Sequence, residues 1–172
     1  MSQRPYNVLI LCTGNSARSV MAEALFTVMG KGRFKAYSAG SHPTGRVNLL
    51  AVELCAAAGY DTTQLRSKSW DEFAQPNAPQ MDLVITVCDQ AAGEACPFWP
   101  GTPMTAHWGF EDPAAFEGSE QEKREHFNKV FRQIMNRVIQ FVNLPLEVLD
   151  RAASQQEMRT IGSRPAEESH EQ

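Results

Sequence analysis

A cysteine and an arginine stand six positions apart in the segment CTGNSARS, residues 12–19, which follows an apolar run. A loop of this size, built of Gly and small polar residues, can curl so that its backbone N–H groups form a concave anion site. The positive end of a following helix would strengthen that site. Arg18 could donate two hydrogen bonds to a tetrahedral oxyanion, and Cys12 in these positive surroundings would favour the thiolate. The segment therefore predicts a nucleophile directed at a phosphate-like anion. The simpler alternative is a buried cysteine at a strand end, followed by an ordinary helix cap.

Two further cysteines bracket a long segment rich in Gly and Pro. Cys88 ends an apolar run, and Cys96 follows eight residues later. Long irregular loops are more often functional than accidental, and a thiol close to Cys12 could attack it once it carries an adduct. The alternatives are a core residue at 88 with an incidental thiol at 96, or a zinc site that adds His107 but lacks paired C-x2-C spacing. Cys55 lies on the apolar face of a predicted helix and is expected to be a core residue.

Asp112 precedes Pro113, in the segment HWGFEDPA. The residue before a proline is held extended, which would project the Asp112 carboxyl from its loop. A carboxylic acid beside a bound oxyanion can protonate a departing oxygen, so Asp112 is a candidate general acid. Glu111 is the neighbouring rival, and a plain turn residue before proline is the alternative.

Length and composition indicate one domain with a proper core. The chain has 172 residues, of which 42% are hydrophobic and 21% charged, and its net charge is −4. Nothing in this balance favours nucleic acid or an anionic membrane as a partner. No apolar run approaches the ~18 residues of a membrane span, and the N-terminus lacks signal-peptide features. We expect a cytoplasmic protein, in which four cysteines indicate chemistry or metal binding rather than structural disulfides.

Hydrophobic periodicity predicts alternating strands and helices. Cys12, Cys88 and His107 all fall at carboxyl ends of predicted strands, where parallel α/β sheets bind ligands, so we expect them to converge. Ser119 and Glu122 fit a capping box. We expect a catalytic domain over residues 1–145 and a polar, flexible tail over 146–172. The predicted strands are 6–11, 34–38, 82–87 and 104–107, and the predicted helices are 19–29, 47–58 and 120–142.

These motifs resemble the low-molecular-weight protein tyrosine phosphatase superfamily, which includes arsenate reductases of the same fold. The resemblance is most specific in CTGNSARSVMAE, VITVCDQAAGEACP and HWGFEDPA. It implies an α/β three-layer sandwich with a four-stranded parallel sheet. It also implies that Cys12 is the nucleophile, Arg18 an oxyanion ligand and Asp112 the general acid. The implied oxyanion-binding loop comprises Thr13, Gly14, Asn15, Ser16, Ala17, Arg18 and Ser19.

The stretch that holds Cys88 and Cys96 resembles the loop of arsenate reductases that pass a disulfide among three cysteines, although those keep seven positions between the two. The resemblance implies that Cys12 attacks arsenate, that Cys88 then attacks Cys12 and releases arsenite, and that Cys96 resolves the disulfide. An external dithiol, either thioredoxin or glutathione with glutaredoxin, would complete the cycle. No bound cofactor and no metal are expected, and the chain is expected to be a monomer.

The main alternative is a tyrosine phosphatase that uses Cys12, Arg18 and Asp112 alone. Such phosphatases usually carry an aromatic residue after the Asp-Pro pair, where this chain has Ala114 and Ala115, which disfavours a phosphotyrosine substrate. A non-catalytic oxyanion sensor would need no acid, so the candidate acid argues against it.

Supporting residues behind the loop are also implied. Asn15 should tolerate a left-handed backbone, and Ser19 could donate a hydrogen bond to the Cys12 thiolate. In some related reductases a potassium ion sits behind the loop, on Asn, Glu, Ser and Asp ligands. Asn15, Glu23 and Ser38 match three of these, whereas the fourth position is Lys68. Its ammonium group would replace the cation, so no potassium requirement is predicted.

Overall fold

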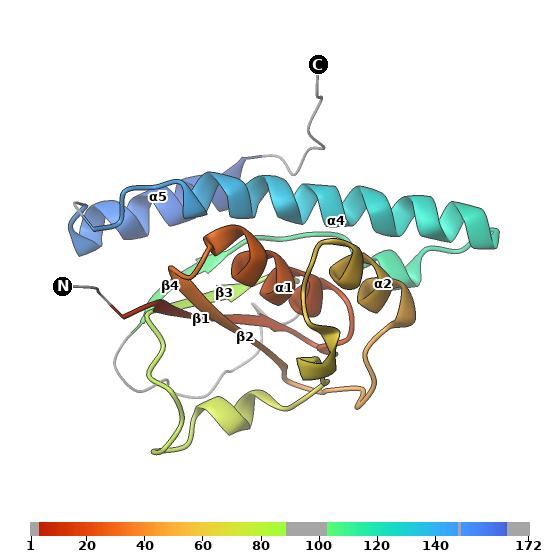
Figure 1. Ribbon diagram of the computed structural model, residues 1–172, viewed down its shortest axis with the longest axis horizontal. Helices are drawn as coiled ribbons and strands as arrows, with labels where there is room; N and C mark the ends of the chain where they lie inside the picture. The colour runs from red at the N-terminus through yellow and green to blue at the C-terminus, as the bar shows by residue number, and fades with distance from the viewer. Residues whose placement is uncertain (1–3, 89–102, 148, 165–172) are drawn as a thin grey trace.

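The computed structural model describes residues 4–88, 103–147 and 149–164, and its centre is a four-stranded parallel sheet (Figure 1). The strand order is β2-β1-β3-β4. The central strand β1 is the apolar run of the sequence, and burial on both faces explains why that run is continuous rather than alternating. The strand bounds are β1 Tyr6–Cys12, β2 Phe34–Gly40, β3 Leu83–Thr86 and β4 Met104–His107.

The long helices gather on one side of the sheet (Figure 1). Their apolar residues pack with those of the strands in one core, where Phe26, Phe34, Trp108 and Phe141 form a cluster of aromatic rings. The predicted capping box is confirmed at Ser119, whose side chain accepts from the amide three residues later. The helices are α1 Arg18–Gly30, α2 Leu49–Ala57, α4 Glu120–Val142 and α5 Arg151–Ser163.

The opposite face of the sheet is also covered. Leu9, Leu11 and Val84 point to this side and pack against Trp70 and Phe73. Those two aromatic residues belong to a short 3-10 helix, η2 Trp70–Phe73. With apolar layers on both faces of a parallel sheet, the predicted α/β fold class is confirmed.

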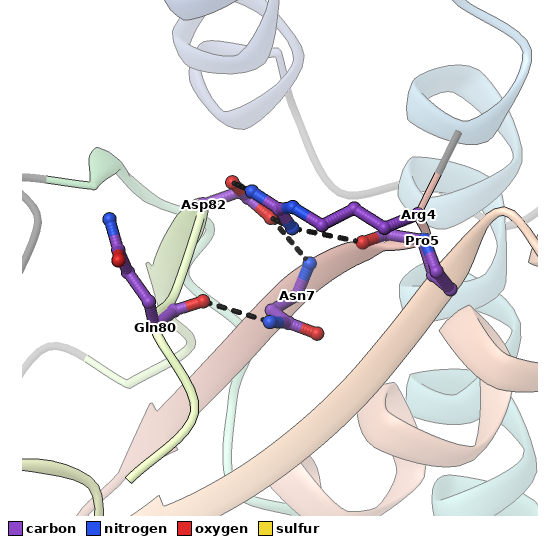
Figure 2. Close-up of polar contacts among 5 residues, drawn as sticks. All are labelled: Arg4, Pro5, Asn7, Gln80 and Asp82. Atoms are coloured by element: carbon purple, nitrogen blue, oxygen red, sulfur yellow. Dashed lines mark hydrogen bonds and ion pairs between the residues drawn. The ribbon is translucent and has the colours of Figure 1, made fainter. Parts of the chain in front are cut away.

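A polar clamp joins the starts of β1 and β3, at the sheet end away from residues 12–18 (Figure 2). Asp82 accepts two hydrogen bonds of 2.8 Å from the Arg4 guanidinium and one of 2.8 Å from the Asn7 amide. The Asn7 side chain also donates to the Gln80 carbonyl at 2.8 Å. These contacts fix the register in which Leu11 lies opposite Thr86 at the other end of the strands.

The structure corrects the prediction that a flexible tail begins at residue 146. Arg151–Ser163 form helix α5, whose N-cap Asp150 accepts from the Ala153 amide at 2.8 Å. Met158 and Ile161 are buried in the main core. A stripe of so few apolar residues in a polar segment gave too weak a periodic signal for a helix prediction. In the described part of the chain, none of the helices is long and apolar enough to cross a membrane.

Candidate active site

The loop between β1 and α1 is held from outside by its carbonyl oxygens. The carbonyls of Thr13, Gly14 and Ser16 all accept hydrogen bonds from residues beyond the loop. Because these carbonyls point outward, the peptide N–H groups that follow them turn inward, an arrangement that could hold an anion. The donors, at 2.9–3.0 Å, are the amides of His42, Thr44 and Asn48 and the hydroxyl of Ser67.

Asn15 fixes the loop through buried hydrogen bonds. Its backbone is left-handed, with φ 47°, as expected, and its side chain is fully buried. The side-chain amide donates to Ser19 Oγ at 2.8 Å and to Ser38 Oγ at 3.0 Å, and its oxygen accepts from the Lys68 amide at 2.8 Å. One side chain therefore joins the loop to α1, β2 and the segment before η2.

Cys12 lies at the floor of this loop and is only 3% exposed. Its Sγ lies 3.0 Å from Ser19 Oγ and accepts from the Asn15 amide at 3.3 Å. Both neighbours can donate a hydrogen bond to the sulfur, and the first turn of α1 begins beside it. The predicted contact between Ser19 and the candidate nucleophile is present.

Arg18 and Asp112 meet at the mouth of the loop. Arg18 Nη2 lies 3.7 Å from Asp112 Oδ2, and Arg18 Nη1 donates to the Phe110 carbonyl at 3.0 Å. Asp112 caps the 3-10 helix η3 Pro113–Ala115, with Oδ1 accepting from the Ala114 amide at 3.0 Å, and its side chain remains 42% exposed. The candidate acid is therefore accessible and borders the oxyanion loop.

Glu111, the rival acid, is engaged elsewhere. Its carboxylate lies 3.1 Å from His126 Nε2 and 3.8 Å from Lys129 Nζ, both on α4. These partners hold Glu111 toward α4, whereas Asp112 pairs with Arg18 of the loop. The geometry therefore favours Asp112 as the acid.

The cysteines fall into distinct settings. Cys88 Sγ lies 3.5 Å from Thr13 Oγ1, which places a second, buried thiol against the loop. Cys55 is fully buried in α2, and burial raises the pKa of its thiol to about 12, which keeps it a neutral core residue. Cys96 lies outside the described residues.

His107 does not join Cys12 and Cys88 as the strand ends suggested. Its Nδ1 lies 2.7 Å from Thr86 Oγ1, and the residue borders a cleft of about 570 Å³ formed with residues of α4 and α5, including Arg137 and Gly162. The carboxyl ends of the parallel strands lie at the same edge of the sheet, as predicted, but β4 is the outermost strand. Its terminal residue, His107, has an exposed side chain on the same face as Thr86, and its carbonyl packs against Gly162 of α5.

A buried polar chain continues behind Asn15. Ser38 Oγ donates to Glu23 Oε1 at 2.5 Å, and the Tyr60 hydroxyl donates to Glu23 Oε2 at 2.8 Å. Burial raises the pKa of Glu23, an effect that these hydrogen bonds and the nearby charge of Lys68 reduce. Burial in turn lowers the pKa of Lys68, whose ammonium donates to the Arg66 carbonyl at 2.9 Å.

Tyr60 was missed in the sequence, because nothing in its immediate neighbours indicates a contact 37 positions away. A cleft of about 860 Å³ reaches the buried chain at Glu23 and Tyr60. It lies behind Asn15 rather than at Cys12, so it is not where an oxyanion would meet the nucleophile.

Comparison with known proteins shows the family of this chain. A profile of the family described as low molecular weight phosphotyrosine protein phosphatase matches residues 7–155. Arsenate reductase of Bacillus subtilis (strain 168) is 40% identical over 134 residues, which cover 78% of this chain and 93% of that protein. Arsenate reductase of Halalkalibacterium halodurans is 38% identical over the same shares.

Solved structures give the same result. The arsenate reductase of Archaeoglobus fulgidus DSM 4304 is 34% identical, with a TM-score of 0.59, over 80% of this chain and 99% of that one. A structure titled as an arsenate reductase in the phosphate binding state is 27% identical, with a TM-score of 0.61, over 80% of this chain and 96% of that one. The chain belongs to the low molecular weight phosphotyrosine protein phosphatase family.

Proposed function

We propose that this protein is an arsenate reductase that binds arsenate in the loop of residues 12–18 and reduces it to arsenite. The observation that carries the proposal is the second buried thiol, Cys88, which lies against Thr13 of the loop that holds the nucleophile Cys12. Hydrolysis of a phosphate ester needs one thiolate, whereas reduction of arsenate needs two electrons from a pair of thiols. The names of the matched relatives support the same substrate.

The first step uses the loop and the acid. The Cys12 thiolate attacks arsenic, a sulfur–arsenic bond forms and an arsenic–oxygen bond breaks. The departing hydroxyl group takes a proton from Asp112 and leaves as water, because hydroxide is a poor leaving group. Arg18 and the inward N–H groups hold the remaining oxyanion.

The second step is the reduction. The Cys88 thiolate attacks the Cys12 sulfur, a disulfide forms and the sulfur–arsenic bond breaks with its electron pair going to arsenic. Arsenic passes from the pentavalent to the trivalent state and leaves as arsenite. Cys96 then attacks Cys88, which frees the Cys12 thiolate and leaves a Cys88–Cys96 disulfide for an external dithiol, either thioredoxin or glutathione with glutaredoxin. We propose this cycle for a monomer in the cytoplasm, with no bound cofactor.

The test is arsenate-dependent oxidation of NADPH, coupled through thioredoxin and its reductase. We expect the wild type to turn over, and Cys88→Ser and Cys96→Ser to stop after at most one event. Cys55→Ser is the matched control, because it removes a buried thiol outside the proposed relay, and it should keep cycling. Continued turnover of either relay variant would refute the three-cysteine cycle.

A phosphatase is the second candidate, because family membership and the trio of Cys12, Arg18 and Asp112 favour it. Within the described residues, the pair that follows Asp112-Pro113 is Ala114 and Ala115, so no aromatic wall stands there to hold a tyrosine ring. A weak aryl phosphatase activity is therefore expected. Brisk cleavage of an aryl phosphate by a wild type that ignores arsenate would establish the phosphatase in place of the reductase.

A further inference from the structure

The backbone that leads to Asp112 is anchored residue by residue. The Trp108 amide donates to the Thr86 carbonyl at 2.7 Å, and the Phe110 amide donates to the Val87 carbonyl at 3.1 Å. The path of β4 along β3 therefore continues past the end of the strand. The anchoring reaches to within two residues of Asp112, whose own side chain is exposed.

Arg137 of α4 supplies an anchor from the opposite side. Its Nη1 donates to the Gly109 carbonyl at 3.0 Å, and its guanidinium carbon lies 4.7 Å from the centre of the Phe110 ring. Its Nη2 donates to the Arg164 carbonyl at 2.6 Å, just beyond α5. The side chain is 5% exposed, and burial lowers its pKa.

This buried charge is costly to keep. Among residues 4–88, 103–147 and 149–164, no carboxylate forms an ion pair with Arg137, and its buried Nε has no hydrogen-bond partner. A buried cation held only by carbonyls and one ring is not an efficient source of stability. What the arrangement does fix is the position of the Gly109–Phe110 backbone relative to α4 and α5.

Helix α5 braces the same segment and lies beside β4 (Figure 1). The indole Nε1 of Trp108 donates to the Met158 carbonyl at 3.0 Å. Gly162 packs so closely that a Cβ there would lie 2.5 Å from the His107 carbonyl and 2.5 Å from Trp108 Cδ1. The family match ends at residue 155, so the half of α5 that makes these contacts lies beyond it.

We infer that Arg137 is a positioning residue that, with the C-terminal half of α5, holds the loop of the general acid. This inference rests on the proposed role of Asp112. Arg18 now holds the Phe110 carbonyl, yet the same guanidinium must also bind the oxyanion. An anchor that does not touch substrate keeps the loop in place while Arg18 changes partners.

The test is a double-mutant cycle on the first turnover, measured as arsenite release from the fully reduced enzyme with no external dithiol. Arg137→Met should slow release about tenfold in the Asp112 enzyme, because displacement of a reacting group by about 1 Å costs up to 10²-fold. In the Asp112→Asn background the same change should have almost no effect, since no acid remains to be positioned. Gln155→Ala is the matched control: it removes two α5 contacts, to the amide and carbonyl of Thr105, away from the acid loop, and should leave the rate unchanged.

The outcomes distinguish a failure of the acid role of Asp112 from a failure of the positioning role of Arg137. If Asp112→Asn alone does not slow release, the acid assignment in the proposed function fails. If Asp112→Asn slows release but Arg137→Met slows both backgrounds equally, or neither, the positioning role is refuted. Should Arg137→Met fail to fold, Trp108→Phe, which removes the bond to Met158 and part of the ring that packs against Phe26 and Phe141, decides the same cycle by the same criteria.

Discussion

Replacing Asn15 should separate the two ways in which this residue stabilises the loop. Its side chain makes three buried hydrogen bonds, and its backbone adopts φ 47°. Asn15→Ala removes all three bonds and forces alanine, which has no polar side chain, to adopt the left-handed backbone conformation. Asn15→Gly removes the same bonds but leaves a residue that accepts this backbone readily.

The size of the expected loss in unfolding free energy follows from the contacts of Asn15. The Lys68 amide loses its acceptor in a buried position, which costs about 1–3 kcal/mol, while the Ser38 hydroxyl keeps its bond to Glu23. The left-handed backbone costs alanine roughly 1–2 kcal/mol. We therefore expect Asn15→Ala to lower the free energy of unfolding by about 3 kcal/mol, and to be about 1 kcal/mol less stable than Asn15→Gly.

The assay is urea unfolding of both variants, with the free energy extrapolated to water. Asn48→Ala is the matched control, because it makes the same chemical change at the N-cap of α2, where about 1 kcal/mol is expected. Equal stability of the Ala and Gly variants would refute the strain argument. A loss no larger than that of the control would refute the importance of the buried network.

Three further predictions concern the surroundings of the loop. Lys68→Met should raise the pKa of Glu23 further, because it removes a nearby positive charge. The variant should therefore lose stability more steeply than the wild type as pH rises above the ordinary pKa of a glutamate, and parallel stability curves would contradict this. Gly40→Ala would place a Cβ 2.4 Å from the Thr13 carbonyl oxygen and so displace the loop. It should abolish most of the arsenite release in the first turnover. A fully active variant would show that the loop tolerates this displacement. Exchange of potassium for sodium should leave the wild-type melting temperature unchanged, and a clear rise with potassium would contradict the prediction that Lys68 replaces the ion.

The parts of the site that could be predicted from sequence are those fixed by local chain geometry. The loop of residues 12–18 follows from a buried strand, a helix start and the residues between them. Asn15 was expected in a left-handed backbone because its short polar side chain tolerates that region, and φ 47° confirms it. The capping box at Ser119 is likewise a local pattern of residues three positions apart.

Contacts between distant segments account for what was missed. Arg137 bonds to Gly109 and Arg164 across 28 and 27 positions, whereas an arginine on a helix is ordinarily a solvated charge. Helix α5 carries few apolar residues, so its pattern gave little sign that Met158 would be fully buried. Such residues acquire their roles only when the sheet order has placed β4 at the edge that α5 covers.

The register of β1 and β3, rather than the spacing in the sequence, determines how Cys12 and Cys88 lie relative to each other. Leu11 lies opposite Thr86 in the parallel pairing of β1 and β3, so Cys12 and Cys88 leave neighbouring strands only one residue out of step. The clamp of Asp82 on Arg4 and Asn7 holds that register at the other end. The first disulfide of the proposed relay therefore depends on the rigid sheet, and arsenite release should be insensitive to the length of the segment after Cys88. The eight-residue step to Cys96 bears only on the second disulfide, so any difference from three-cysteine relatives should appear in the resolution of the disulfide rather than in the reduction of arsenic.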